Sequence, residues 1–256
     1  MSRVLKQIVV AGIFCVIVFA LGLGAYKLVV PTQPSPTPNL TINLSPIAVL
    51  TTKLLNIKNN DYDFVAKVSN ANTDYGSGNV QYVVSFMDAA GTKVSTKSGS
   101  FYILPGQTKY VVVTPLSFNT AISRAEFEID SIDWQKLNPL ALLGTNLVPK
   151  NVSYSIPSNG SAFAKVGGSI SNTTDLDFDV VDVAIVVLDT GGNILAVNKT
   201  TINTFLAKTE RGFEAAWFTP FLGQVQRADA QAGTNAFNNL NFLRRYGGSE
   251  RFQQFY

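Results

Sequence analysis

The chain has 256 residues, a formal net charge of +3, no histidine and one cysteine, Cys15. Ser-His-Asp, Cys-His and HExxH catalysis are excluded because each needs an imidazole, and beyond Cys15 no disulfide, thiolate or imidazole metal site can form. The net charge comes from Arg3, Lys6 and Lys27, since the other 17 basic residues equal the 17 acidic ones. This balance argues against a nucleic-acid partner, and no cofactor is expected.

A near-continuous apolar run occupies residues 8–30, where Lys27 is the only charged side chain. About 20 apolar residues cross a hydrocarbon core roughly 30 Å thick, so the run predicts one transmembrane helix in contact with the lipid bilayer. Arg3 and Lys6 precede the run, and this bias places residues 1–7 in the cytoplasm and the later residues outside it. The expected localisation is the cell membrane, with a single pass.

A cleaved signal peptide is the competing interpretation of the same run. Small residues at Ala20, Gly22 and Gly24 offer plausible cleavage positions. The apolar run nevertheless continues to Val30, which is longer than the usual ~7–15-residue hydrophobic region of a signal peptide. The length favours an anchor that is retained.

Residues 31–46 are expected to form a stalk. Pro31, Pro34, Pro36 and Pro38 block helix and sheet hydrogen bonding and favour polyproline II, a semi-rigid spacer. A proline-rich ligand for a partner module is the alternative, but a spacer after an anchor is the simpler explanation.

Beyond the stalk, the composition is rich in Val, Ile, Thr, Ser, Asn, Gly and aromatic residues, which is typical of β-sheet. Two similar hairpins are expected, one with a first strand over 81–88 and a turn at Gly91, the other with a first strand over 182–189 and a turn at Gly192. Asp88 should accept hydrogen bonds from turn N–H groups, and so should Asp189.

The two hairpins lie about 100 residues apart and indicate an internal duplication. Residues 47–143 and 144–236 are predicted to be two tandem immunoglobulin-like β-sandwich domains, each folding on its own, with the boundary near Gly144. Further matches in the same order are Lys53 with Lys150, 66–68 with 164–166, Thr114-Pro115 with Thr219-Pro220, and Ala125-Glu126 with Ala228-Asp229.

Strand periodicity of two predicts which side chains form the two cores. In the first domain they are Tyr82, Val84 and Phe86, and in the second Val181, Val183, Ile185 and Val187. A second turn is expected at 104–108, where Pro105 presets φ and Gly106 is free to adopt a positive φ. None of these residues forms a chemical site.

The strand, its terminal aspartate, the following glycine and the Leu104-Pro105-Gly106-Gln107-Thr108 turn together resemble the FxLYD-type domain. This is a small β-sandwich of prokaryotic envelope proteins, similar in shape to late-embryogenesis-abundant type 2 and immunoglobulin-like sandwiches. The motif stands here as 84–88 and 185–189, without the family's Phe and Tyr in either copy, and the second copy has 206–210 where the Pro-Gly turn belongs. The resemblance implies a fold and an extracytoplasmic setting, with no catalytic residues.

Candidate chemical sites are few. Asp175, Asp177 and Asp179 would line one face of a strand, with Asp182 close behind. Calcium binding is conceivable there, but carboxylates ~7 Å apart along a strand favour a solvated face that discourages edge pairing. A carboxylate-pair hydrolase would draw on Asp61, Asp63, Asp74, Asp130 and Asp133, among which nothing selects. Trp134 and Trp217 are expected to be core residues.

Residues 237–256 form a tail rich in aromatic and arginine side chains, a composition typical of interface cores. The candidate contacts with a protein partner are Phe237, Phe242, Arg244, Arg245, Tyr246, Phe252, Phe255 and Tyr256. Packing of the tail onto the second sandwich explains the composition equally well, and attraction to anionic lipid is a third alternative.

The sequence therefore predicts a membrane-anchored extracytoplasmic protein of a prokaryotic envelope that acts by binding or scaffolding, without catalysis, together with an envelope protein partner. The alternatives are a pilin-like or envelope-complex subunit and a carboxylate-based hydrolase. The pilin layout also has an apolar amino-terminal helix and a β-rich head, but the acidic residue that such assemblies use near the start of the helix is missing.

Overall fold

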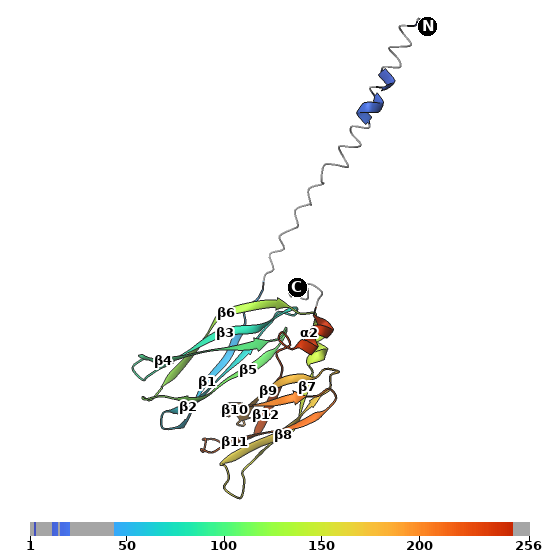
Figure 1. Cartoon of the computed structure of the whole chain (residues 1–256). Helices are drawn as coiled ribbons and strands as arrows, with labels where there is room; N and C mark the ends of the chain where they lie inside the picture. Colours follow the sequence, from blue (N-terminus) through green and yellow to red (C-terminus); the bar gives the residue numbers. More distant parts are fainter. Residues whose placement is uncertain (1–2, 4–11, 15, 21–43, 248–256) are drawn as a thin grey trace. The chain divides into compact units, whose positions relative to one another are not determined.

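A computed structural model describes residues 3, 12–14, 16–20 and 44–247 (Figure 1). Residues 12–14 and 16–20 are helical. Most of the predicted membrane segment 8–30 and the stalk up to residue 43 lie outside the described residues. Within the part that is described, no helix combines the length and apolar character that a bilayer crossing requires.

All the strands belong to the unit formed by residues 44–256. In chain order they are β1 Ala48–Lys58, β2 Asp61–Ser69, β3 Tyr75–Met87, β4 Lys93–Ile103, β5 Thr108–Ser117, β6 Arg124–Lys136, β7 Leu147–Ser155, β8 Ala164–Asn172, β9 Phe178–Leu188, β10 Ile194–Phe205, β11 Glu210–Trp217 and β12 Arg227–Gly233. A 3₁₀ helix, η1 Pro139–Thr145, separates β6 from β7, and a short helix, α2 Leu240–Tyr246, follows β12. The structure is mainly β, as the composition predicts.

The strands form four small antiparallel sheets, two in each half. The first half has sheets ordered β1-β2-β5 and β4-β3-β6, and the second has β7-β8-β11 and β10-β9-β12. Adding six to each strand number of the first half gives the second, so the duplication inferred from sequence holds for the strand order. No sheet combines strands from both halves. The halves β1–β6 and β7–β12 are called the first and second sandwich below.

Each sandwich closes over its own core, which contains the predicted faces. Tyr82, Val84 and Phe86 of β3 lie in the first core. Val181, Val183, Ile185 and Val187 of β9 lie in the second. Trp217 is buried in the second core and donates its indole N–H to the Val197 carbonyl at 3.1 Å, and Trp134 packs against the first. The period-two prediction is confirmed on both strands.

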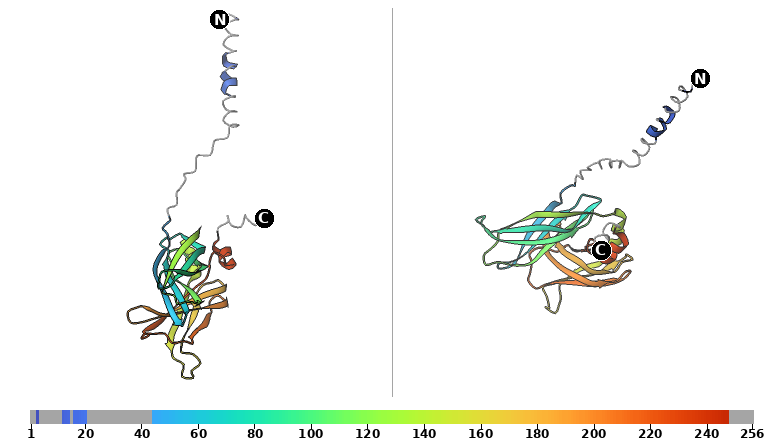
Figure 2. Two further views of the ribbon diagram at one scale, coloured as in Figure 1. Left: turned by 90° about the vertical axis from the view of Figure 1, so that its left-hand side faces the viewer. Right: turned by 45° about the horizontal axis from the view of Figure 1, so that its top comes forward.

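The opposite faces of several of these strands are buried as well. Leu55, Val65 and Val112 of the first sandwich meet residues of β9 and β10 in a third apolar cluster, called the interface layer below. Its members from the second sandwich are Val186, Leu188, Ile194 and Val197. Figure 2 shows the first sandwich, in blue and green, lying against the second, in yellow to orange.

The interface layer joins the two predicted domains, and whether each sandwich folds on its own stays a prediction. Residues 44–256 form one compact unit rather than two. The predicted boundary near Gly144 falls inside η1, where Gly144 is buried, and nearby Leu137 and Ala141 are buried in a fourth apolar cluster. The segment 137–150 is therefore anchored by buried residues, although Leu143 and Asn146 are exposed.

The hairpin turns form as the sequence predicts. The Asp88 carboxylate accepts from the N–H groups of Ala90 and Thr92, both at 2.9 Å. The Asp189 carboxylate accepts from Gly191 and Asn193 in the same way, both at 2.8 Å. Gly91 and Gly192 have φ of 81° and 79°, values that few other residues adopt.

Two buried asparagines fix the structural register of the repeats. Asn70 donates its side-chain amide to the carbonyl of Leu104 at 3.0 Å, and Asn172 donates to the carbonyl of Leu206, also at 3.0 Å. Their backbone N–H groups bond to Gln107 and Thr209. The two asparagines are therefore equivalent positions, 102 residues apart.

This register corrects part of the sequence matching. It aligns Val68 with Ile170, so the match of 66–68 with 164–166 is four residues out of register. Thr114-Pro115 is a cis pair within β5, whereas 219–220 lies beyond the end of β11. The match of Ala125-Glu126 with Ala228-Asp229 is confirmed. Ala125 pairs with Phe86 and Ala228 pairs with Val187, and these two partners each lie two residues before the aspartate of their hairpin.

The same register makes Lys208 the counterpart of Gly106, and both have a left-handed backbone, with φ of 56° and 65°. A residue with a Cβ pays about 1 kcal/mol in that conformation, whereas glycine does not. We expect Lys208→Gly to be about 1 kcal/mol more stable than Lys208→Ala in chemical denaturation. The pair is the proper comparison because both variants lose the exposed ion pair to Asp175. An alanine variant equal to or more stable than the glycine variant would contradict the prediction.

Candidate functional site

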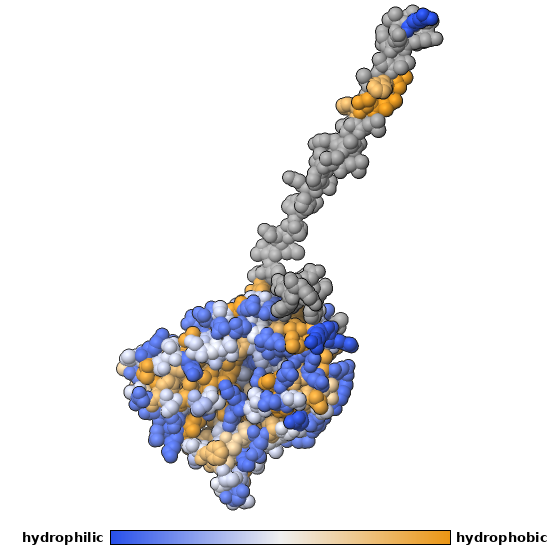
Figure 3. Space-filling view, in the orientation of Figure 1, coloured by the Kyte–Doolittle hydropathy of each residue, from blue (hydrophilic) through white to orange (hydrophobic). Residues whose placement is uncertain are grey.

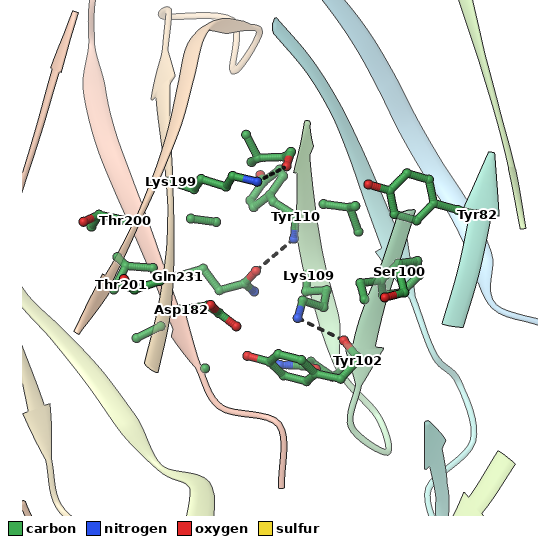
Figure 4. A pocket seen from close by; sticks show the side chains of 18 residues that line it. Tyr82, Ser100, Tyr102, Lys109, Tyr110, Asp182, Lys199, Thr200, Thr201 and Gln231 are labelled. Atoms are coloured by element: carbon green, nitrogen blue, oxygen red, sulfur yellow. Dashed lines mark hydrogen bonds between the residues drawn. The ribbon is translucent and has the colours of Figure 1, made fainter. Parts of the chain in front are cut away.

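A cavity of about 500 Å³ lies where the two sandwiches meet, beside the interface layer. It is called the junction cavity below. Its lining comes from β3, β4 and β5 on one side and from β9, β10 and β12 on the other (Figure 4). The polar and ionisable side chains that line it are Tyr82, Ser100, Tyr102, Gln107, Lys109, Tyr110, Asp182, Lys199, Thr200, Thr201 and Gln231.

Lys109 places an ammonium group inside the cavity wall. Lys109 and Tyr110 lie at the start of β5, where the Gln231 side chain of the second sandwich bonds to the backbone of the strand. The Lys109 Nζ lies 3.4 Å from the centre of the Tyr102 ring and donates to the Tyr102 carbonyl at 2.9 Å. Burial lowers the pKa of Lys109 to about 8, and the negative charge of Asp182 offsets part of that effect.

Tyr102 and Asp182 form the opposite pair across the junction. Burial raises the pKa of the Tyr102 hydroxyl well above 10, and the charge of Asp182 and a hydrogen bond to its carboxylate add to the effect. Tyr102 is therefore a neutral phenol at physiological pH. A Cβ at Gly233 would come within 2.8 Å of the Tyr102 hydroxyl, so the lack of a side chain there makes room for the ring.

Two side chains of the second sandwich bond directly to the backbone of β5. The Gln231 amide accepts from the Tyr110 N–H at 2.9 Å and donates to the Thr108 carbonyl at 2.7 Å. The Lys199 ammonium donates to the Val112 carbonyl at 3.4 Å. These contacts fix the position of one sandwich against the other and keep the cavity walls in place.

The pKa of Lys109 predicts how stability depends on pH. Between about 8 and 10.5 the unfolded chain holds a proton that the folded chain has released, so folding becomes more favourable as pH rises through this window. The gain is up to about 3 kcal/mol. The raised pKa of Tyr102 makes folding less favourable as pH rises above about 10, because the unfolded chain loses the phenol proton before the folded chain does.

Comparison with Lys109→Met isolates the lysine, since Tyr102 is present in both proteins. We expect the unfolding free energy of the wild type to rise relative to Lys109→Met by up to about 3 kcal/mol between pH 7.5 and 10. Chemical denaturation at each pH measures it. Lys109→Arg keeps a permanent charge and should lack the rise. A constant difference between wild type and Lys109→Met would show that the amine titrates normally.

The tail residues proposed as partner contacts divide into three groups. Phe237 and Phe242 are buried in the chain's own fourth apolar cluster with Leu104, Leu137 and Ala141, which corrects their assignment to a partner surface. The reason is the pair of glycines in β3: a Cβ at Gly76 or Gly78 would lie within 3 Å of the Phe237 side chain. These two rings therefore pack on the chain itself, but mainly against β3, the β4–β5 turn and η1 rather than onto the second sandwich as the alternative expected.

The other tail residues lie nearer the surface or outside the described residues. Tyr246 is 36% exposed and packs on Phe242, with ring centres 5.1 Å apart, and on the backbone at Gly144. Arg244 and Arg245 are exposed and line a shallow hollow with Asp175, Asp177 and Asn241. Phe252, Phe255 and Tyr256 lie outside the described residues.

The acidic cluster does not line a strand face, which corrects that expectation. β9 begins at Phe178, and Asp175 and Asp177 belong to the loop before it. The Asn172 side chain draws this loop in by bonding to Thr174 and Leu176, and Asp177 accepts from the Ala207 N–H at 2.7 Å. Lys208 pairs with Asp175 at 2.9 Å. Among the described residues, no group of three or more metal-ligating side chains is close enough to hold an ion.

The hydrolase alternative asks for two buried acids facing each other. In the described part of the chain, Asp63 alone is a buried carboxylate, and its pKa is raised by burial, with the Thr114 hydrogen bond acting the other way. The structure therefore does not supply the pair. On the face shown in Figure 3, hydrophobic and hydrophilic side chains are interspersed. The junction cavity gathers polar and ionisable side chains in one place and is therefore a better candidate site than this surface.

The comparisons with known proteins add little. No protein-family profile matches the chain, and no curated protein matches it. Two solved structures show faint similarity, each with 12% identity and a TM-score of 0.19 over 68% of this chain. They are two crystal structures of a glycosyl hydrolase family 2 member from Bacteroides cellulosilyticus, one of them from microfluidic crystals. The chain spans only 28% and 26% of their lengths, and similarity at this level carries no argument.

Proposed function

We propose that the protein is a membrane-anchored, extracytoplasmic binding protein of a prokaryotic cell envelope. Residues 8–30 are the anchor, 31–46 the stalk, and the two sandwiches are the binding body. It has no catalytic role, and the junction cavity is its ligand site. The observation that carries the proposal is this cavity, because its charged side chains come from both sandwiches and contacts between the sandwiches hold its walls in place.

The strand order supports tandem immunoglobulin-like domains. In such sandwiches the first, second and fifth strands share one sheet, and the third and sixth share the other. Both sandwiches here follow this pattern, with the fourth strand added to the second sheet and no seventh strand. The resemblance to FxLYD-type domains belongs to the same proposal and accounts for an envelope setting. Arg244 and Arg245 are the described tail residues best placed to contact a protein partner.

Two measurements test the proposal. Mass spectrometry of the protein extracted from native membranes should find residues 8–30 retained, whereas a mature terminus near Leu23 or Ala25 would identify a signal peptide. Protease is added to cells whose outer layers have been removed and whose cell membrane is intact. It should cut within residues 44–256 but not within residues 1–7. Protection of the body would overturn the extracytoplasmic assignment.

The ligand site is tested on full-length protein purified gently from native membranes. Thr201→Arg puts a bulky side chain at the cavity, and Ser153→Arg makes the same change on an exposed position of β7. Native mass spectrometry should find a bound species in the wild type and in Ser153→Arg but not in Thr201→Arg. Retention of the bound species by all three proteins would place the site elsewhere.

A further inference from the structure

The charges that line the junction cavity do not balance. Lys109 and Lys199 each contribute an ammonium, and Asp182 is the only carboxylate in the lining. Neither ammonium forms an ion pair within 4 Å among the described residues, and each bonds instead to a backbone carbonyl. Lys199 and Asp182 are exposed at the cavity. One excess positive charge in a cleft favours a bound anion, because the walls of a cleft concentrate the field of the charges that line it.

The excess of one positive charge favours a ligand that carries one negative charge. A monocarboxylate brings the cavity to neutrality, whereas a phosphate dianion overshoots and is repelled by Asp182. The volume of about 500 Å³ lies in the range of small-molecule sites, which is roughly 300–1,000 Å³. The site therefore fits a small organic acid better than a polymer segment.

The uncharged lining indicates a ligand that carries hydroxyl groups. Ser100, Thr200 and Thr201 supply hydroxyls that both donate and accept, and Asp182 supplies an acceptor for a ligand O–H. Tyr82 and Tyr102 add aromatic rings beside them, a combination of flat apolar surface and polar groups that suits a hydroxylated ring or chain. The Gln231 amide is occupied by the backbone of β5.

We propose that the junction cavity binds a small hydroxylated monocarboxylate, such as a sugar acid, with its carboxylate held by the exposed ammonium of Lys199 and a hydroxyl held by Asp182. This inference rests on the proposed function, since it names the ligand class of the same cavity. The cavity draws on both sandwiches, because Ser100 and Tyr102 belong to the first, and Lys199 and Asp182 to the second.

The test uses the full-length chain in detergent and isothermal titration calorimetry. The probes are galacturonate and gluconate, with methyl galacturonate ester and glucose as neutral counterparts, and inorganic phosphate as the dianion. We expect the acids to bind with a Kd of about 1 mM or tighter and each neutral counterpart to bind about tenfold more weakly or worse. Phosphate should bind more weakly than the acids.

Variants locate the site. Lys199→Met should weaken galacturonate binding about tenfold because it removes the charged donor, and Lys109→Met should weaken it less because its ammonium is held by Tyr102. Lys199 is exposed, so Lys199→Met keeps the test valid even where Lys109→Met folds poorly. Lys97→Met, at an exposed lysine on β4 that does not line the cavity, is the matched control and should bind as the wild type does.

Three results would overturn the inference: equal affinity for galacturonate and its methyl ester, unchanged affinity in Lys199→Met, or no heat from either acid at millimolar concentration. None of these contradicts the proposed function if native mass spectrometry still finds a species lost only in Thr201→Arg. The protein could instead bind the acids while residues 44–256 are protected from external protease. That result would support the ligand site and overturn the extracytoplasmic assignment.

Discussion

Replacing Phe242 by alanine is expected to lower the unfolding free energy of the protein by about 3–5 kcal/mol, the usual cost of removing a buried phenylalanine ring. Phe242 is fully buried and packs with residues of the β4–β5 turn, of η1 and of the segment before α2. Thermal or chemical denaturation measures the loss.

Leu240→Ala is the matched control for Phe242, because Leu240 begins the same helix and is 62% exposed. We expect that variant to lie within about 0.5 kcal/mol of the wild type. Equal and small effects at both positions would show that α2 is detached in solution. The tail would then be free for a partner, as the aromatic composition alone allows.

Replacing Val186 by aspartate is expected to cost more than about 3 kcal/mol, because it leaves an unpaired charge in the interface layer. Val186 is 1% exposed and packs against the first sandwich with Leu188 and Val197. In a second sandwich standing alone, the same side chain would face water. The cost of this substitution therefore measures the association of the two sandwiches.

Val180→Asp is the control on the same strand, since Val180 is 46% exposed. It should cost no more than about 1 kcal/mol, the span of strand propensities. Similar costs for the two substitutions would mean that the sandwiches are joined only by the chain. Independent folding, as the sequence suggests, would then be correct after all.

The cores and turns could be predicted from sequence because they depend on local rules. Period-two alternation identified the inward faces of β3 and β9, and the aspartate-glycine pattern identified the turns at Asp88 and Asp189. Each of these features is set by residues within about ten positions of one another.

The interface layer was missed although β9 carried a signal for it. The run Val183-Ala184-Ile185-Val186-Val187-Leu188 is apolar on both faces, which indicates a strand covered on both sides. Alternate residues alone predict one buried face, the core of the strand's own sandwich, and leave the other face unassigned. The predicted alignment of the two repeats was wrong where it relied on short matches, such as 66–68 with 164–166, which carry little information. The hydrogen bonds of the two buried asparagines give the correct alignment.

The junction cavity had no local signal at all. Tyr102, Lys109 and Asp182 belong to three strands and come together only through the packing of one sandwich on the other. Lys109 in particular sits in an ordinary strand sequence, and nothing in its neighbours distinguishes it from an exposed lysine. A site of this kind is a property of the arrangement and cannot be found in a linear pattern.

The contacts of Gln231 and Lys199 have a consequence for solubility. β5 is the last strand of its sheet, and such a strand offers unpaired N–H and C=O groups to any other extended chain, a common start of aggregation. Here the Thr108 carbonyl, the Tyr110 N–H and the Val112 carbonyl are all satisfied by these two side chains. Two side chains of one repeat thus stand in for the missing neighbouring strand of the other and protect that edge from a foreign one.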